Sequence, residues 1–403
     1  MKKLLVLLCA SMLLLVSCDF GFIDRDVTTE NETETMLIDL ENPLFLEDFL
    51  VVKFGGKYGY IGSDGKYIIY PQYDNASNFS EGLACVKLNG KYGYIDKNGQ
   101  VVIGFQFDMA GDFNEGLAVV KVNQKYGFID KSGLYVIQPI FELASDVYEG
   151  YARVKLDGKY GFVNNKGAYA IYPQFDYAGD FYENLALVNL GGKYGYISSD
   201  GKFVINPQFE QGGNFCEGLA LVVMNNKYGF VDTQGRYAIN PQFDFASSFS
   251  EGYALVKMNG KYGFVDKSGR YVINPQYDNA ADFSEGLALV RLNDKCGYVD
   301  YDGKYVIEPK YAVANSFSKV GLATVLVNDK YGYIDQTGKM VITPQFSALA
   351  LSSNSYTIPN NCDFCDDGFA IVSVNDGREI LYGIIDQTGT YLANPQFESI
   401  MRD

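Results

Sequence analysis

Residues 115–148 read EGLAVVKVNQKYGFIDKSGLYVIQPIFELASDVY, and close relatives of this stretch recur along the chain. A fixed glycine marks the register of ten copies: Gly59, Gly93, Gly127, Gly161, Gly195, Gly229, Gly263, Gly297, Gly332 and Gly383. Successive glycines are 34 residues apart seven times, then 35, then 51. Such a period indicates a repeat architecture, in which each unit buries its apolar face against its neighbours. We therefore expect one repeat domain in this chain of 403 residues rather than several separate cores.

Each unit is predicted to be a β-meander of three short strands. Residues 115–122 are a mostly apolar run rich in β-branched residues, and in residues 125–130 Tyr126 and Phe128 share one strand face. Asn123-Gln124 between them suits a two-residue type I′ hairpin. The segment from Asp130 to Gly133 has the residues of a type I turn with a glycine bulge. Residues 135–137 form the third strand, so the whole unit is predicted to be β-structure.

Proline and glycine occupy fixed positions in the unit. Nine of the eleven prolines share one position, just after the third strand: Pro71, Pro139, Pro173, Pro207, Pro241, Pro275, Pro309, Pro344 and Pro395. Proline cannot donate to a ladder, so we expect it to end the sheet and an irregular connector to follow. That connector should place two aromatic rings in the core, the second being Phe113 or its equivalent. The glycine inside the second strand predicts close approach of a neighbouring ring or backbone.

These submotifs resemble the bacterial WG repeat proteins. The resemblance rests on Glu-Gly-Leu-Ala, then Gly-Lys-Tyr-Gly-Tyr/Phe-Ile-Asp, then Gly, Val-Ile, Pro and Phe/Tyr-Asp, and it runs from about Leu44 to Phe397. This chain has no tryptophan, and tyrosine or cysteine stands at the tryptophan position of the repeat. The resemblance implies an all-β repeat used outside the cytoplasm, and it does not imply an enzyme. A ligand site that depended on an indole ring would be absent here.

The predicted fold is a tandem array of ten three-stranded β-meanders with a superhelical, solenoid-like form. Propeller blades usually have four strands and about 40 residues or more, and propellers usually have 4 to 8 blades. Units of 34 residues with three strands fit that geometry less well, so a closed propeller-like ring is the alternative. The repeat domain is assigned to residues 44–403, with an insertion at about 349–366 near its end.

The first residues resemble the signal of a bacterial lipoprotein. Two lysines precede an apolar run, and Leu15 to Cys18 matches the lipobox, in which the cysteine is lipidated. We expect residues 1–17 to be removed, Cys18 to carry the lipid and residues 18–43 to form an acidic tether. The predicted location is the bacterial cell envelope, on the periplasmic side or the surface.

Composition excludes several function classes. The formal net charge of −16 argues against nucleic acid as a partner. The chain has no histidine, which removes Ser-His-Asp and Cys-His catalysis and histidine metal sites. Cys85, Cys216 and Cys296 fall at different repeat positions and read as single thiols, whereas Cys362 and Cys365 form a C-x-x-C that is either a local disulfide or two free thiols. No cofactor or metal is expected.

Two series of acidic residues follow the repeat. The first begins each Asp-x-x-Gly turn: Asp96, Asp130, Asp232, Asp266, Asp300, Asp335 and Asp386. The turn itself explains these aspartates, with calcium or acid–base work as the alternative. The second precedes the first strand: Glu81, Glu115, Glu149, Glu183, Glu217, Glu251 and Glu285. It reads as a solvated rim, with a surface for a cation or basic partner as the alternative.

The aromatic residues form the other candidate site. The tryptophan position holds Tyr58, Tyr92, Tyr126, Tyr160, Tyr194, Tyr228, Tyr262, Tyr331 and Tyr382, with Cys296 in the remaining copy. These rings read first as core packing and otherwise as a ligand-facing ladder. We interpret the protein as an exported, lipid-anchored scaffold without catalysis, which binds a protein, or alternatively a cell-surface glycan. A carboxylate-based hydrolase is the remaining alternative.

Overall fold

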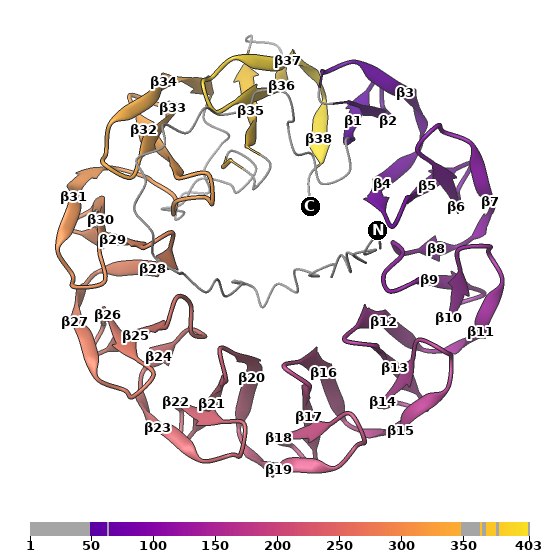
Figure 1. Cartoon of the computed structure of the whole chain (residues 1–403), viewed down its shortest axis with the longest axis horizontal. Coiled ribbons are helices and arrows are strands. Elements are labelled where there is room, and N and C mark those ends of the chain that lie inside the picture. The colour runs from indigo at the N-terminus through magenta and orange to yellow at the C-terminus, as the bar shows by residue number, and fades with distance from the viewer. Residues whose placement is uncertain (1–48, 63, 348–362, 365–367, 376–378, 402–403) are drawn as a thin grey trace, which may run out of the picture.

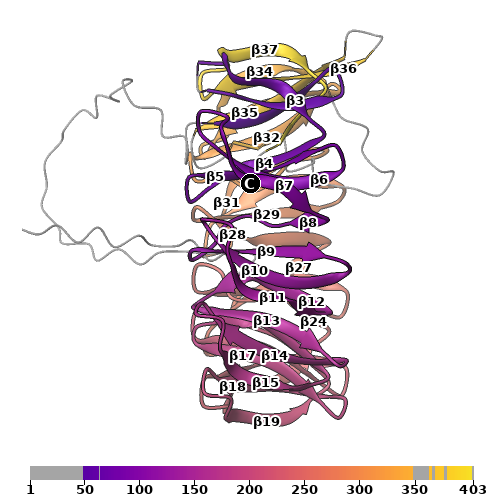
Figure 2. The ribbon, with the colours of Figure 1, turned by 90° about the vertical axis from the view of Figure 1, so that its right-hand side faces the viewer.

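The computed structural model describes residues 49–62, 64–347, 363–364, 368–375 and 379–401. Over these residues the chain folds into ten small antiparallel sheets, which stand as blades around a closed ring (Figure 1). Seen from the side, the ring is a flat disc one blade thick (Figure 2). The described residues contain no helix that is long and apolar enough to cross a membrane.

Blade 4 shows the common plan. From the inside of the ring outwards its strands are β12 (Leu143–Tyr148), β13 (Tyr151–Leu156), β14 (Lys159–Asn164) and β15 (Tyr169–Phe175). Blades 1 to 3 contain, in the same order, β38 (Ser399–Met401), β1 (Leu50–Phe54), β2 (Lys57–Ile61) and β3 (Tyr67–Tyr73); β4 (Asn75–Ser80), β5 (Leu83–Leu88), β6 (Lys91–Asp96) and β7 (Val101–Phe107); and β8 (Met109–Ala110), β9 (Leu117–Val122), β10 (Lys125–Asp130) and β11 (Tyr135–Phe141).

The remaining blades repeat the plan with small changes. Blades 5 to 7 are β16 (Tyr177–Tyr182), β17 (Leu185–Leu190), β18 (Lys193–Ser198) and β19 (Phe203–Phe209); β20 (Gln211–Cys216), β21 (Leu219–Met224), β22 (Lys227–Asp232) and β23 (Tyr237–Phe243); and β24 (Phe245–Ala246), β25 (Tyr253–Met258), β26 (Lys261–Asp266) and β27 (Tyr271–Tyr277). Blades 8 to 10 are β28 (Asn279–Ser284), β29 (Leu287–Leu292), β30 (Lys295–Val299) and β31 (Tyr305–Tyr311); β32 (Leu322–Val327), β33 (Lys330–Asp335) and β34 (Met340–Ser347); and β35 (Phe369–Asn375), β36 (Ile380–Asp386) and β37 (Tyr391–Phe397).

Pairing between the two ends of the repeat domain closes the ring. Strand β38 runs antiparallel to β1, with Val52 opposite Ile400, so the last strand of the chain completes the first blade. Ile400 is buried in a cluster with Leu50 and Val52. The predicted superhelical array is therefore wrong, and the alternative, a propeller-like ring, is the fold. Closure removes two exposed sheet faces that an open array would leave at its ends.

The prediction of three strands per unit is also wrong. The segment expected to be an irregular connector forms the innermost strand of the next blade, as in β12. Its aromatic residues are buried as predicted, for example Phe107 and Phe113. Alternation was not visible in this segment because the ladder slips between Ala144 and Val147, where the register shifts.

Proline lies within the outermost strand and does not end it. Strand β15 continues through Pro173, and its register against β14 shifts twice around that point. The outermost strand is an edge, so the missing N–H breaks no ladder and hinders pairing with another chain. Gly161 makes this bend possible, because a Cβ there would lie 2.5 Å from the Ile171 carbonyl oxygen and 2.6 Å from the Pro173 nitrogen. The predicted close approach at the glycine is confirmed, and its cause is backbone.

The two-residue hairpins and the turns form as predicted. Asn123 and Gln124 have φ of 49° and 66°, as a type I′ hairpin requires. Gly133 donates its backbone N–H to the Asp130 carbonyl oxygen at 2.9 Å, which closes the Asp-x-x-Gly turn. The sequence therefore sets the local shape of each blade.

Adjacent blades pack through one recurrent aromatic pair. The ring is the fourth residue of the third strand in one blade, and its partner is a phenylalanine on the inner side of the next blade. Ring centroids lie 4.7–5.0 Å apart in Tyr60–Phe79, Tyr94–Phe113, Phe162–Phe181, Tyr196–Phe215, Phe230–Phe249, Phe264–Phe283, Tyr298–Phe317 and Tyr333–Phe364. In four of these pairs the tyrosine hydroxyl donates to a backbone carbonyl oxygen of the next blade, as Tyr94 does to Gly111 at 2.7 Å; the others are Tyr60, Tyr196 and Tyr298.

Ring closure predicts that Ile400 stabilises the whole ring. Ile400→Ala should lower the free energy of unfolding by about 2 kcal/mol or more, because it leaves a cavity between the first and last blades. Denaturant unfolding followed by circular dichroism measures this change. The control is Val204→Ala on the outer strand β19, where the side chain is 41% exposed. Equal stability of both variants would contradict closure through β38.

Candidate functional site

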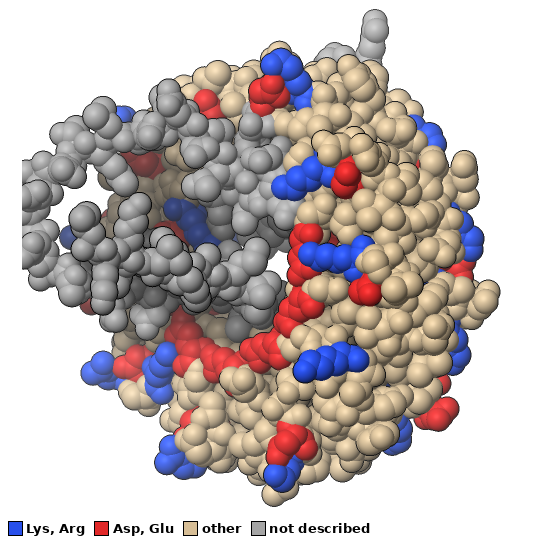
Figure 3. Space-filling view, turned by 45° about the vertical axis from the view of Figure 1, so that its right-hand side comes forward, with Lys and Arg blue, Asp and Glu red and all other residues tan. Residues whose placement is uncertain are grey.

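The hairpin turns place two kinds of residue on opposite sides of the disc. Two-residue turns rich in asparagine, aspartate and glycine join the second and third strands of blades 1 to 9 on one side. Glu-Gly turns, with Glu-Asn in blade 5, join the first and second strands of blades 2 to 8 on the other side, and their glutamates have positive φ, 50° for Glu149. Acidic side chains follow the inner edge of the ring (Figure 3). The two sides must therefore be considered separately.

The Glu-Gly turns link each blade to the next. The Glu81 carboxylate accepts hydrogen bonds from the Gly116 backbone N–H at 3.1 and 3.3 Å, and Glu251 accepts from Gly286 at 3.1 Å. The same contact recurs from Glu115, Glu149, Glu183 and Glu217. The series forms a partly exposed rim, and its carboxylates also hold neighbouring turns together, which the sequence did not indicate.

The aspartates of the Asp-x-x-Gly turns are structural, as predicted. The Asp130 carboxylate accepts from the backbone N–H groups of Ser132 and Leu134 at 2.9 and 3.1 Å. The Ser132 hydroxyl also donates to it, and this bond lowers the pKa of Asp130 below its ordinary value. Among the described residues, no group of three acidic or cysteine side chains is placed to hold a metal ion.

The tyrosines at the tryptophan position differ in solvent exposure. From Tyr58 to Tyr262 they are half-buried on the asparagine-turn side, whereas Cys296 and Tyr331 are buried. A lysine on the adjacent strand covers five of these rings, at 4.9–5.7 Å from the ring centroid: Lys53, Lys87, Lys121, Lys155 and Lys257. Each ring thus packs on one face while its edge reaches the surface.

Three apolar side chains extend this tyrosine row across blades 3 to 7. Met109, Tyr177 and Phe245 each begin an inner strand, and they are 50%, 41% and 39% exposed. Tyr177 lies between two tyrosines, 5.9 Å from Tyr160 and 6.1 Å from Tyr194. Phe245 lies in the same way between two others. We call this set the aromatic arc: Met109, Tyr126, Tyr160, Tyr177, Tyr194, Tyr228, Phe245 and Tyr262.

Other exposed tyrosines lie on the outer rim. Tyr70 and Tyr172 are each 72% exposed, and they stack on Tyr67 and Tyr169 at 5.1 and 4.8 Å between centroids. Each stands just before the proline of its strand, a position at which the other described copies have a non-aromatic residue. These pairs are isolated from each other, whereas Tyr177 and Phe245 each join two tyrosines of the aromatic arc.

A second inter-blade link lies on the inner strands. The Ser145 hydroxyl donates to the Asp180 carboxylate of the next blade at 3.0 Å, and Ser247 donates to Asp282 at 2.5 Å. The Ser77 hydroxyl bonds Asp112 in the same way. In blade 9 Asn315 stands at the position of this serine, and both Asn315 and Thr324 donate to the Asp363 carboxylate. Sequence reasoning missed this series, although the aspartates recur at the repeat period.

Asp146 is the exception in this series. The position that should supply its donor is Gly111, and no hydrogen bond or ion pair reaches the Asp146 carboxylate from the described residues. Burial, with the charges of Asp112 and Asp180, raises the pKa of Asp146 to about 6. The inner phenylalanine of this interface is replaced by Val147, so the interface is also smaller.

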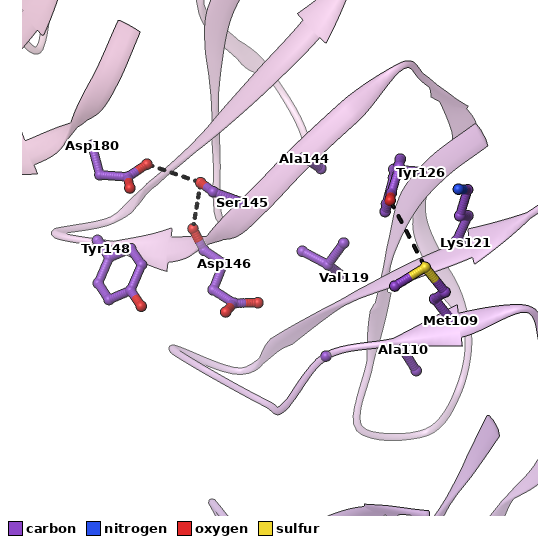
Figure 4. A pocket seen from close by; sticks show the side chains of 11 residues that line it. Met109, Ala110, Val119, Lys121, Tyr126, Ala144, Ser145, Asp146, Tyr148 and Asp180 are labelled. Carbon is purple, nitrogen blue, oxygen red and sulfur yellow. Dashed lines mark hydrogen bonds between the residues drawn. The ribbon is translucent and has the colours of Figure 1, made fainter. Parts of the chain in front are cut away.

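A groove of about 360 Å³ opens at this interface, between blades 3 and 4. In Figure 4, Asp146, Ser145, Asp180 and Tyr148 lie at one end, and Met109 lies with Tyr126 and Lys121 at the other. Ala110, Gly111, Val119 and Ala144 complete the lining. In the sequence, Val147 stands where the copies of blades 2 to 8 otherwise have phenylalanine, whereas Gly111 is not distinctive, because Gly179 and Gly213 occupy the same repeat position.

The WG containing repeat family matches nine successive segments, from residues 58–92 to residues 331–356. The chain belongs to the WG-repeat family. This match covers most of the chain. Most of its segments begin at a tyrosine of the tryptophan position, such as Tyr58 or Tyr92 of this WG-repeat protein. No curated protein matches the sequence.

Several solved structures are similar to this WG-repeat protein at low sequence identity. A crystal structure of the eukaryotic initiation factor has 12% identity and a TM-score of 0.50, over 88% of this chain and 97% of that one. Dihydro-heme d1 dehydrogenase NirN has 15% identity and a TM-score of 0.38, over 89% and 75%. Hsv2 of Kluyveromyces lactis has 9% identity and a TM-score of 0.32, over 68% and 90%. The first similarity supports the fold, and none extends to function.

The cysteines that the structure describes in the WG repeats are buried. Cys85, Cys216 and Cys296 are buried free thiols, as predicted for single cysteines. Cys18, Cys362 and Cys365 lie outside the described residues, as do the signal, the tether and most of the insertion. The predictions of a lipid site and of a local disulfide therefore stay predictions.

Replacing Asp146 by a neutral residue is expected to stabilise the folded protein, and the size of this gain should depend on pH. The folded pKa of Asp146, about 6, exceeds the unfolded value, so stability from this group is present at low pH and is lost as pH rises through 6. Asp146→Asn should therefore raise the free energy of unfolding by about 2 kcal/mol at pH 7 and by little at pH 4.5. Urea unfolding at both pH values measures this.

The matched control for that measurement is Asp180→Asn. Asp180 accepts a hydrogen bond from Ser145 and lies 3.7 Å from the Arg153 guanidinium, so its neutralisation should bring no gain. A gain of the same size in both variants would show that general charge reduction, rather than the unpaired state of Asp146, is the cause.

Proposed function

We propose that this WG-repeat protein is a non-catalytic scaffold that binds another protein through the aromatic arc. The observation that carries the proposal is the series of partly exposed apolar side chains in the aromatic arc, which spans blades 3 to 7 and is interrupted by Gln211 between Tyr194 and Tyr228. Tyr177 and Phe245 each project between two half-buried tyrosines, and Met109 projects beside Tyr126. Contiguous apolar surface on a soluble fold is typical of interaction sites.

The composition of the arc favours a protein partner. Tyrosine, phenylalanine and methionine are enriched in the centres of protein interfaces, where a few residues account for most of the affinity. Exposed ion pairs lie around the arc on the same side, such as Lys159–Asp176 and Lys227–Asp244, both at 2.5 Å. An apolar centre with a polar border is the usual arrangement of such an interface.

Photo-crosslinking tests the position of the interface. A benzophenone amino acid placed at Tyr177 or Phe245 should give a crosslink to one defined protein in producing cells. The same amino acid at Tyr172, on the outer rim, is the control because that side chain is 72% exposed. Equal yield of the same adduct from the arc and from the rim would contradict the proposal.

Affinity of the identified partner provides the quantitative test. The double variant Tyr177→Ala, Phe245→Ala should weaken binding at least about tenfold, as expected for central aromatic contacts. Tyr172→Ala should leave affinity unchanged, and thermal melting should show that all variants fold. Unchanged affinity in the double variant would place the binding site elsewhere.

We further propose that the protein is exported and held at the cell envelope by lipid on Cys18. Support comes from the sequence Leu15 to Cys18 and the acidic segment that follows it. In a bacterial host, Cys18→Ala should abolish lipid labelling and move the protein from the detergent phase to the aqueous phase. Unchanged detergent partition of the variant would contradict lipid anchoring.

A further inference from the structure

The groove between blades 3 and 4 contains a carboxylate, Asp146, to which no described residue donates a hydrogen bond. At the next interface, Ser145 donates to Asp180, and the Arg153 guanidinium lies 3.7 Å from the same carboxylate. The equivalent positions in blade 3 hold Gly111 and Val119, and neither side chain can donate a hydrogen bond. The carboxylate of Asp146 therefore faces the groove without the donor that its counterparts have.

A groove of about 360 Å³ lies beside that carboxylate. Its wall includes Ala110 and Gly111 of blade 3 and Ala144 of blade 4, whose small side chains leave it open. A partly buried carboxylate without a hydrogen-bond donor is costly, and a cationic group bound beside it would offset that cost.

The groove is polarised along its length. Asp146 and Asp180 lie at one end, where the two carboxylates make the surroundings negative. The middle is lined by Val119, Ala110 and Ala144, which contribute only carbon atoms from their side chains. At the far end the Lys121 amine lies 5.0 Å from the centroid of the Tyr126 ring and makes that end positive. A ligand with one positive group must therefore direct it towards Asp146.

We propose that this groove binds the side chain of a lysine or arginine from the protein partner, with its charged head at Asp146 and its aliphatic stem along Val119. Such a side chain combines a hydrocarbon stem with a cationic tip, which matches the apolar middle and acidic end of the groove. A guanidinium or ammonium group at Asp146 would supply the charge that Arg153 supplies to Asp180 at the next interface.

The groove is also joined to the aromatic arc. Met109 and Tyr126 belong to both, so a partner lying on the arc can extend one residue into the groove. This inference thus rests on the proposed function and specifies the chemistry that the partner needs at this point. It predicts a basic residue in the contacting segment of the partner.

Methyl NMR with small probes tests the groove without the partner. The probes are N-acetyl-arginine methylamide and N-acetyl-lysine methylamide, with N-acetyl-citrulline methylamide as the uncharged control of nearly the same shape. We expect the methyl signals of Met109, Val119 and Ala144 to shift saturably with both cationic probes, at concentrations on the order of 1–10 mM. Equal shifts with citrulline would overturn the proposal, because they would show binding without charge.

Two variants provide the decisive comparison. Gly111→Ser places a hydroxyl where Ser77, Ser145 and Ser247 stand, and its Cβ would lie 3.1 Å from an Asp146 oxygen. It should restore the missing donor, fill the groove and reduce probe binding at least tenfold. Asp146→Asn should cause a similar loss, whereas Asp282→Asn, at an interface where Ser247 is the donor, should bind the probes as the parent does.

The outcomes separate this inference from the proposed function. Probe binding unchanged by Gly111→Ser or Asp146→Asn overturns the groove assignment, even if crosslinks from Tyr177 identify a partner. Charge-dependent probe binding that both variants remove supports the groove assignment, even if the arc yields no crosslink. Thermal melting of each variant shows whether a loss of binding reflects unfolding. Since the serine occurs at three equivalent positions in the native ring, Gly111→Ser is expected to fold.

Discussion

An aromatic ring pressed against the inner phenylalanine of the next blade is the contact on which this ring depends. A unit of about 34 residues has too few large side chains to offset the loss of chain entropy when it orders alone. The pairs from Tyr60–Phe79 to Tyr333–Phe364 supply the missing burial between neighbours. Because each blade needs a neighbour on both sides, an open end is costly, and Ile400 on β38 removes that cost by completing the first blade.

Both polar inter-blade links follow from this packing. When the aromatic pair fixes the distance between blades, the Glu81 carboxylate reaches the Gly116 amide and the Ser145 hydroxyl reaches Asp180. Charged groups that would otherwise repel one another along the inner edge thus gain defined partners. At the interface of Val147 the link from Glu115 to Gly150 is present, whereas the serine–aspartate link is missing because glycine stands at position 111. The unpaired Asp146 therefore follows from the residue at position 111 rather than from the smaller core.

The same geometry accounts for the surface proposed to bind a partner. From Tyr58 to Tyr262 the tyrosines at the tryptophan position lie at the margin of the core, because the ring two residues later in the strand fills the place between blades. Lys121 and its equivalents cover one face of these tyrosines and leave an edge at the surface. Tyr177 and Phe245 then bridge tyrosines of adjacent blades. Tyrosines that pack at the margin of the core thereby also contribute apolar surface to the aromatic arc.

The sequence by itself determined the β-meander, its hairpins and its turns, because these depend on residues close together in the chain. Asn123-Gln124 at positive φ and the fit of Gly161 beneath Pro173 are examples of such local steric rules. Only the tertiary structure decided that the fourth strand forms and that the array closes. Closure pairs Val52 with Ile400 from opposite ends of the domain, and it depends on a small rotation summed over ten blades. Asp146 became a candidate site only in that context, because its missing partner belongs to a different blade.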